Sequence, residues 1–421
     1  MIYWALLLHA YQPPTQLPRV VRKIANESYR PLITLYKEMP EAKVTMNICG
    51  SLTEILYDLC FTDILEGLED LARNGQVEFT GSAKYHPILP LIPEDEIRRQ
   101  IELNVETNRN FFGDAFKPRG FFLPELCYGK EIVKPVAETG HEWFIMSGIG
   151  CPAEWPVNII YQVESEGKRM AVFFRDDRLS NLVGFQKMEG GKPFLDELRK
   201  VQSERSLEDI YVITAMDAET FGHHIWLWEK LFLMEAYEEI QQQKLLSVQQ
   251  KQILEEAKGE VKAVTISELL DLFPEGEVIE PTPSSWSTAA EDLANDDPYP
   301  LWKGKDNKLH SYLWESLQIC LETVQKALEV ADNDESRKYA RIARLLLDRA
   351  EHSCQWWWAS KRPWWDLNMI ANGLHEHYRA MINAYKAIKS SGCAEEIKEE
   401  YYYKVLAARE YRGRISDELF M

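Results

Sequence analysis

The chain has 421 residues, of which 45% are hydrophobic and 27% charged, and its formal net charge at pH 7 is −19. This length suits one large domain with an accessory region, and the composition is typical of a folded globular protein rather than a disordered one. The negative charge argues against nucleic acid or an anionic membrane as a partner, because both would repel such a surface. We therefore expect no nucleic-acid and no membrane partner, and a neutral substrate fits better.

The cysteines and the first residues give no indication of an export pathway. The seven cysteines are an odd number without a CxxC pair, which suggests neither a disulfide framework nor a Cys-based zinc site. The opening stretch MIYWALLLHAYQPP lacks a basic region and a small-residue cleavage site. Its apolar part, about nine residues, is too short to span a bilayer. We interpret it as the buried first strand of a cytoplasmic protein of unknown oligomeric state.

Short apolar runs alternate with helical segments over roughly the first 270 residues. The runs that predict strands are Ile2–Leu8, Lys43–Ile48, Gln76–Phe79, Gly120–Leu123, Trp143–Met146, Met170–Phe174 and Ile210–Thr214. A further run at Val261–Ile266 is either an eighth strand or the lead into a helix. The predicted helices between them are Pro18–Glu38, Ser51–Asn74, Glu94–Phe111, Lys130–Thr139 and Pro193–Ser203. Near-continuous apolar strands separated by helices predict a parallel sheet buried on both faces. Seven or eight such units favour a closed or nearly closed barrel, with an open doubly wound sheet as the alternative.

The pattern changes near Pro281. The stretch PTPSSWSTAAEDLANDDPYPLW is rich in Pro, Ser, Asp and aromatic residues, which predicts a long ordered loop of the kind that is usually functional. Helical spacing then continues to the end, over His310–Val330, Ser336–Trp358, Asn368–Ser390 and Glu395–Ser416. We expect a (β/α) barrel at residues 1–280, a bridging loop or lid at 281–307, and an all-α domain at 308–421.

Polar side chains follow the C-terminal ends of the predicted strands, where parallel α/β barrels gather their chemistry. They are His9, Gln12, Asn47, Lys84, His86, Glu125, Ser147, Arg175, Asp176, Asp177, Arg178, Asp217 and Glu219. Each alone has a structural interpretation, such as a hydrogen-bonded histidine or a helix N-cap at Asp217. Their coincidence at seven strand ends favours one common site.

Two carboxylates are the most telling members of this set. Glu125 and Asp217 directly follow the apolar runs FFLP and ITAM, so both should sit at strand tips. Cleavage of a glycosidic bond needs such a pair, one carboxyl to protonate the leaving oxygen and one to attack or stabilise the sugar cation. The thirteen tryptophans would suit stacking on sugar rings, although aromatic residues also simply fill cores.

Five stretches occur in order along nearly the whole chain. They are LHAYQPP (Leu8–Pro14), GSAKYHPILPL (Gly81–Leu91), GFFLPELCYG (Gly120–Gly129), MDAETFGHH (Met216–His224) and AEHSCQWWW (Ala350–Trp358). These stretches resemble the five sequence regions of glycoside hydrolase family 57, and SSWST (Ser284–Thr288) and FFRDDRLS (Phe173–Ser180) also look like that family. The resemblance implies an incomplete seven-stranded, TIM-like (β/α) barrel followed by an all-α helical domain. It also implies a retaining enzyme that acts on α-glucans, of the α-amylase, 4-α-glucanotransferase or branching type.

By position, the resemblance implies that Glu125 is the nucleophile and Asp217 the general acid/base of a double displacement on α-1,4-glucans. It further implies that His9 and His86 line the sugar subsite and that Trp357, from the helical domain, closes over the sugar. We add neighbouring candidates for substrate binding: Gln12, Phe122, Phe221, His223, His224 and Trp286. Glu219 is interpreted as a structural carboxylate, and no metal and no cofactor are expected. The chain departs from the family pattern where Phe121 and Phe122 replace a frequent Trp, and at Ile225.

Two other functions stay open. The first is metal-dependent chemistry, as in a polysaccharide deacetylase or a zinc mannosidase, with possible ligands His9, His86, Asp217, His223 and His224. It is the weaker because the adjacent His-His pair would point its rings in different directions on a helix. The second is a non-catalytic glycan-binding protein. Within the enzyme hypothesis, hydrolysis and transfer differ in whether water or a sugar hydroxyl reaches the intermediate first.

Overall fold

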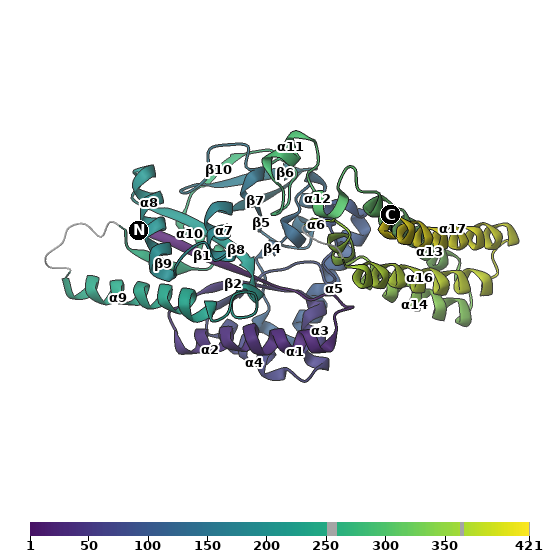
Figure 1. The fold of residues 1–421 in the computed structure, drawn as a ribbon, viewed down its shortest axis with the longest axis horizontal. Coiled ribbons are helices and arrows are strands. Elements are labelled where there is room, and N and C mark those ends of the chain that lie inside the picture. The colour runs from purple at the N-terminus through teal and green to yellow at the C-terminus, as the bar shows by residue number, and fades with distance from the viewer. Residues whose placement is uncertain (251–258, 363–365, 421) are drawn as a thin grey trace. The chain divides into compact units, whose positions relative to one another are not determined.

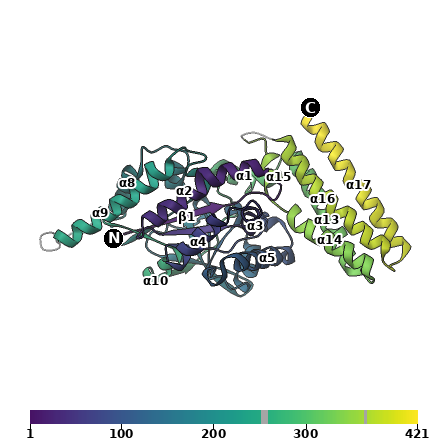
Figure 2. The ribbon, with the colours of Figure 1, turned by 90° about the horizontal axis from the view of Figure 1, so that it is seen from below.

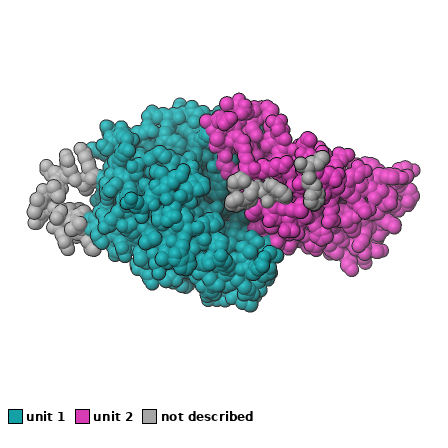
Figure 3. Space-filling model, in the orientation of Figure 1, with its two compact units in different colours: residues 1–12, 16–84, 89–286 teal, residues 13–15, 85–88, 287–421 magenta. Residues whose placement is uncertain are grey.

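The chain folds into two compact units (Figure 1, Figure 3), and the computed structural model describes residues 1–250, 259–362 and 366–420. Unit 1 comprises Met1–Gln12, Gln16–Lys84 and Leu89–Trp286. Unit 2 comprises Pro13–Thr15, Tyr85–Ile88 and Ser287–Met421. All the strands belong to unit 1, and the long C-terminal helices belong to unit 2.

The first sheet of unit 1 has the order β3-β2-β1-β8, with β9 also paired to β1. Its strands are β1 (Ile2–Ala10), β2 (Val44–Ile48), β3 (Val77–Phe79), β8 (Ile210–Asp217) and β9 (Val261–Val264). All of these pairings are parallel. The run at Val261–Ile266 therefore does form a strand, and helix α10 (Ile266–Leu272) begins two residues after it.

The second sheet has the order β10-β6-β7-β5-β4. Its strands are β4 (Gly120–Phe122), β5 (Trp143–Ser147), β6 (Ile160–Ser165), β7 (Lys168–Arg175) and β10 (Glu275–Val278). Strands β6 and β10 are additions to the expected set. Strand β6 runs antiparallel to β7 through a two-residue turn in which Glu166 and Gly167 both have positive φ, at 48° and 75°. That pair of positive φ angles is what a tight hairpin requires, and Gly167 takes its value without strain.

One glycine joins the two sheets. Gly81 forms a parallel bridge with Phe121; its N–H donates to the Gly120 carbonyl at 2.8 Å, and its own carbonyl accepts from Phe122 at 2.9 Å. At the other edge β7 and β8 share no ladder, although the Asp176 N–H donates to the Ile213 carbonyl at 2.8 Å. The seven parallel strands thus run β8-β1-β2-β3-β4-β5-β7 in a curled sheet that stays open between β7 and β8. This confirms the expected incomplete barrel.

Alternate residues of β1 enter two different cores, which explains its continuous apolar sequence. Trp4, Leu6 and Leu8 pack into the core beneath the surrounding helices, whereas Ala5 and Leu7 pack into the core inside the curled sheet. The helices of unit 1 are α1 (Pro18–Ile24), α2 (Arg30–Glu38), α3 (Gly50–Asp58), α4 (Thr62–Arg73), α5 (Glu94–Phe112), α6 (Val133–Glu138), α7 (Asp177–Gly184), α8 (Gly191–Arg205), α9 (Glu235–Gln250) and α10.

Two predicted helices of unit 1 are interrupted. The segment Pro18–Glu38 contains a π-helical turn at Ala25–Tyr29 between α1 and α2. The segment Ser51–Asn74 divides into α3 and α4 because Cys60 takes a left-handed φ of 63°, which no α-helix accommodates. The break turns the next residue, Phe61, into the core.

Unit 2 is helical, as expected. After the short helices α11 (Ala290–Ala294) and α12 (Pro300–Lys303), its helices are α13 (Lys308–Val330), α14 (Asp334–Ala350), α15 (Cys354–Trp358), α16 (Leu367–Ser390) and α17 (Glu395–Phe420). Figure 2 shows α13, α14, α16 and α17 packed side by side along their lengths. The predicted helix Ser336–Trp358 is divided into α14 and α15. Among the helices that the structure describes, none combines the length and the apolar character that a membrane crossing requires.

Candidate active site

The ends of β1 and β8 bring His9 and Asp217 together. The two strands are parallel, and their register pairs His9 directly with Asp217. On the other side of β1, the His9 Nδ1–H group donates to the side-chain amide oxygen of Asn47, Oδ1, at 2.7 Å. Burial lowers the pKa of His9, against the smaller opposing effects of Asp217 and the Asn47 hydrogen bond. The ring is therefore neutral near pH 7 and is fixed in one orientation.

Two features of its surroundings act on Asp217 in opposite directions: its burial, and the nearby cation of Arg175. Burial raises the pKa of Asp217, and the neighbouring His9 imidazole and the charged Arg175 guanidinium offset part of that rise. The Arg175 guanidinium is held in place by the Ala215 carbonyl at 2.8 Å, by Asp177 at 2.7 Å and by Asn181 at 2.9 Å. A carboxyl with a raised pKa is suited to giving and taking a proton near neutral pH.

Glu125 sits in a tight turn directly after β4. The turn Pro124–Leu126 is a single 3₁₀ turn, in which Glu125 has φ 57° and ψ 19° and Leu126 has φ 49°. Left-handed conformations are rare for residues other than glycine, because the Cβ atom crowds the backbone. The Glu125 carboxylate accepts a hydrogen bond from the Trp286 indole Nε1–H at 2.9 Å.

A cluster of rings connects the two carboxylates. The His9 ring stacks on Phe122 with 4.4 Å between ring centroids and an interplanar angle of 12°. Trp286 meets both rings edge-on, each at 6.0 Å. His9 adjoins Asp217 in the strand register and Trp286 binds Glu125, so both carboxylates lie at the same C-terminal edge of the curled sheet. The structure thus brings together five of the predicted site residues.

A third carboxyl, Glu219, lies behind this cluster. Its Oε1 atom accepts hydrogen bonds from Gln12 Nε2 at 2.9 Å and from the Tyr29 hydroxyl. Burial and then the negative charge of Asp217 raise the pKa of Glu219 to about 7, against the opposing effect of these hydrogen bonds. Gln12 is thereby engaged by Glu219. Tyr29 was not among the predicted residues, and nothing in its local sequence marks it, since it faces Glu219 only through the π-helical turn.

The loop after Glu219 holds three further candidates. Phe221 is fully buried in the helix-side core, where its ring centroid lies 6.2 Å from that of Phe232. His223 donates from Nδ1 to the Glu27 carboxylate at 2.6 Å. The ring centroids of His223 and His224 are 5.4 Å apart, and burial lowers the pKa of His224. Roles for these three residues in substrate binding stay predictions.

The two remaining candidates belong to unit 2. His86 has a left-handed φ of 58° and is fixed by Ser353: the Ser353 N–H donates to the His86 carbonyl at 3.1 Å, and the His86 Nδ1 atom lies 3.0 Å from Ser353 Oγ. Trp357 lies in α15, where its ring meets Trp358 edge-on at 4.7 Å. Trp357 thus lies within the stretch AEHSCQWWW, and His86 is hydrogen-bonded to Ser353 of the same stretch.

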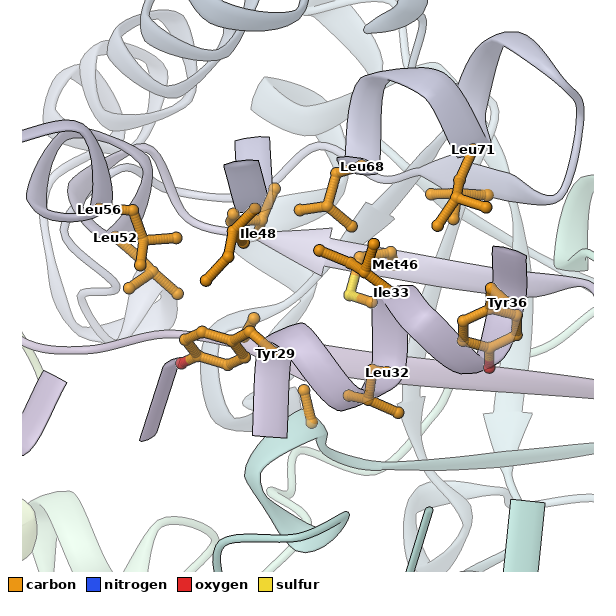
Figure 4. A pocket seen from close by; sticks show the side chains of 14 residues that line it. Tyr29, Leu32, Ile33, Tyr36, Met46, Ile48, Leu52, Leu56, Leu68 and Leu71 are labelled. Carbon is orange, nitrogen blue, oxygen red and sulfur yellow. The ribbon is translucent and has the colours of Figure 1, made fainter. Parts of the chain in front are cut away.

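A small apolar cavity of about 20 Å³ adjoins Ala218, the residue between Asp217 and Glu219, and Figure 4 shows side chains that line it. Its walls include Tyr29, Ile33, Met46, Leu52, Leu68 and Ala218. The Tyr29 ring lines the cavity while its hydroxyl binds Glu219. A space of this size holds at most about one water molecule, and its lining offers water no partners, so it is a packing defect rather than a sugar site.

The open (β/α) barrel thus carries a carboxylate pair, a buried histidine and aromatic rings at its strand ends, an arrangement compatible with chemistry on glycosidic bonds. A family model described as Glycosyl hydrolase family 57 matches residues 7–278. The chain belongs to that family.

Individual relatives agree with this assignment. The chain is 28% identical over 245 residues to a 4-alpha-glucanotransferase of Thermococcus litoralis, which covers 55% of this chain and 35% of that protein. It is 27% identical over 253 residues to an alpha-amylase of Pyrococcus abyssi, covering 57% of this chain and 37% of that protein. The chain thus spans about a third of the length of these curated relatives. The fold is similar to the crystal structure of a GH57-type branching enzyme from Pyrococcus horikoshii, with a TM-score of 0.72, 17% identity, and coverage of 96% and 94% of the two chains.

Proposed function

We propose that the protein is a retaining glycoside hydrolase or transglycosylase that acts on α-1,4-glucans such as starch, glycogen and maltooligosaccharides. Glu125 is the proposed nucleophile and Asp217 the proposed general acid/base. The observation that carries the proposal is the convergence of these two carboxyls at one edge of the barrel, connected through His9 and Trp286. The similarity to a 4-alpha-glucanotransferase and an alpha-amylase supports the substrate class.

The reaction has two displacements. In the first, a Glu125 carboxylate oxygen forms a bond to the anomeric carbon, the glycosidic C–O bond breaks, and the Asp217 carboxyl proton passes to the leaving oxygen. In the second, the Asp217 carboxylate takes a proton from an acceptor hydroxyl, whose oxygen displaces Glu125 from the anomeric carbon. Water as acceptor gives hydrolysis, and a sugar hydroxyl gives transfer.

The environments of the two carboxyls support this division of roles. The raised pKa of Asp217 favours a group that holds a proton when the substrate binds. Glu125 receives an N–H donor from Trp286, which orients a carboxylate for attack. His9, with its neutral ring stacked on Phe122, is suited to contact a sugar hydroxyl beside them.

Substitution of each carboxyl tests the proposal. We expect Glu125→Gln and Asp217→Asn each to lower kcat on maltoheptaose by at least about 100-fold, because each removes one chemical role. The matched controls are Glu66→Gln and Asp58→Asn, which alter exposed carboxyls on α4 and α3. Near-parental rates in both site variants would overturn the assignment. Chromatography of the products separates the two outcomes of the second step, since transfer yields chains longer than the substrate.

The two other functions differ in readily measured results. A metal-dependent enzyme would lose activity after treatment with a chelator and regain it with zinc. A non-catalytic glycan-binding protein would bind maltooligosaccharides and leave their chain-length distribution unchanged.

A further inference from the structure

Trp286 does more at this site than present an aromatic surface. The segment Ser284–Trp286 runs antiparallel to the turn that carries Glu125. The Tyr128 N–H donates to the Ser284 carbonyl at 2.9 Å, and the Ser284 N–H donates to the Tyr128 carbonyl at 3.4 Å. The Trp286 N–H completes the pairing by donating to the Glu125 carbonyl at 3.2 Å. The main-chain N–H of Trp286 thus binds Glu125, the residue whose backbone is left-handed.

This segment is itself anchored to the end of β5. The Thr282 N–H donates to the Gly150 carbonyl at 2.9 Å. A Cβ atom at Gly150 would lie 2.8 Å from the Thr282 carbonyl oxygen and 2.7 Å from Ser284 Oγ, so the close approach requires glycine. The segment that is bonded to the Glu125 turn is therefore fixed in its own right. It connects the turn after β4 to the residues that follow the neighbouring strand β5.

The side chain adds a second attachment. The indole Nε1–H donates to Glu125 Oε2 at 2.9 Å, and the ring lies edge-on against the stacked rings of His9 and Phe122. An indole has a single N–H and no acceptor, so this hydrogen bond leaves Trp286 no polar group for a sugar hydroxyl. A hydrogen bond to a carboxylate is stronger than one to a neutral acceptor, and it fixes the direction of both oxygens.

We propose that Trp286 is a positioning residue that acts through Glu125: its main-chain N–H holds the left-handed turn, and its indole N–H sets the orientation of the carboxylate that attacks the sugar. This inference rests on the proposed function, in which Glu125 is the nucleophile. It differs from a role in substrate binding because it assigns the effect of Trp286 to the chemical step.

Two replacements at position 286 test the proposal. Trp286→Phe keeps an aromatic ring and loses the donor. Incorporation of β-(3-benzothienyl)alanine keeps the shape of the indole and exchanges only the N–H for sulfur. We expect both to lower kcat on maltoheptaose by about 10- to 100-fold, the range of a lost hydrogen bond to a charged group, and to change KM by less than about 3-fold.

Trp143→Phe is the matched control, because the Trp143 indole lies in the same unit and donates its N–H to Ser267 Oγ, at 2.8 Å. It should reduce the melting temperature with little change in kcat. Full kcat in the benzothienyl variant, or a loss confined to KM in either variant, would overturn the role of Trp286 while leaving the proposed function intact. A parent protein that turns over no maltooligosaccharide would overturn both.

Discussion

Two carboxyls with raised pKa values lie two residues apart at the end of β8. Asp217 faces His9 and Arg175, whereas Glu219 faces Tyr29 and Gln12. Because the negative charge of Asp217 raises the pKa of Glu219, the two groups titrate as a pair, and the first proton lost strengthens the hold on the second. Glu219 can therefore influence the protonation of Asp217, the proposed acid/base.

Glu219→Gln should change the pH dependence of stability. The pKa of Glu219 is raised from 4.5 to about 7 in the folded chain, so the folded state binds the proton more tightly than the unfolded state. Its stabilising effect is full below pH 4.5 and is lost as the pH rises through 7. We expect the free energy of unfolding of the parent to fall over this interval by on the order of 3 kcal/mol more than that of Glu219→Gln.

Urea denaturation at a series of pH values measures this difference. Glu204→Gln, an exposed carboxyl beside the C-terminal end of α8, is the control and should follow the parent. Parallel curves for Glu219→Gln and the parent would mean that Glu219 is ionised in the folded protein throughout.

At the scale of elements, the site depends on how tightly α2, α3 and α4 pack behind the Asp217–Glu219 segment. Leu52 of α3 is fully buried and lines the apolar cavity there, and Ala218 lines the same cavity. Any loosening of this packing would reach the segment through Ala218 and through the Tyr29 hydroxyl bound to Glu219.

Leu52→Ala should lower the free energy of unfolding by about 3–5 kcal/mol, because it enlarges an existing void that the rigid surroundings cannot close. Leu231→Ala removes the same atoms from a side chain that is 52% exposed and should change stability by no more than about 0.5 kcal/mol. Denaturation followed by circular dichroism compares the two. A loss under 1 kcal/mol in Leu52→Ala would show that the helices collapse into the space.

The strands of the barrel were predictable because their apolar runs are long and their ends carry polar residues. Strands β6 and β10 were missed for different reasons. The Glu166–Gly167 turn that folds β6 onto β7 resembles any surface turn in sequence, and β10 is short and largely exposed. The breaks at Cys60 and between α14 and α15 were missed because helical spacing continues across them while the tertiary packing does not.

The contacts of the candidate site could likewise be predicted only in part from the sequence. His9 and Asp217 could be placed together because the C-terminal ends of parallel strands meet at one edge. The bond between Trp286 and Glu125 joins residues 161 positions apart, and no periodicity connects them. The contact of Tyr29 with Glu219 likewise depends on a π-helical turn that sequence periodicity reads as ordinary helix.

At the scale of the whole molecule, the net charge of −19 sets how the protein meets its substrate. The electric field of this charge neither attracts nor repels a neutral glucan, whereas it would attract a cationic ligand and repel an anionic one. Binding of the proposed substrate should therefore be governed by aromatic and hydrogen-bond contacts, which salt hardly alters.

KM for maltoheptaose should change by less than about 2-fold between 50 and 500 mM NaCl, because screening acts only on interactions between charges. The control is a melting curve at each salt concentration, which separates an effect on the substrate from an effect on the fold. A steep dependence of KM on salt would indicate a charged substrate and contradict the glucan assignment.

The central claim, that Glu125 attacks the sugar and Asp217 handles the proton, is tested most directly by trapping the intermediate. An Asp217→Ala variant incubated with α-maltosyl fluoride should still form the glycosyl-enzyme, because fluoride leaves without a proton, and should release it slowly for want of a base. Mass spectrometry of peptides from the quenched protein should then find the added sugar on Glu125, and the adduct should disappear on addition of azide. Turnover of the fluoride without any adduct, or an adduct on another carboxylate such as Glu219, would contradict the account.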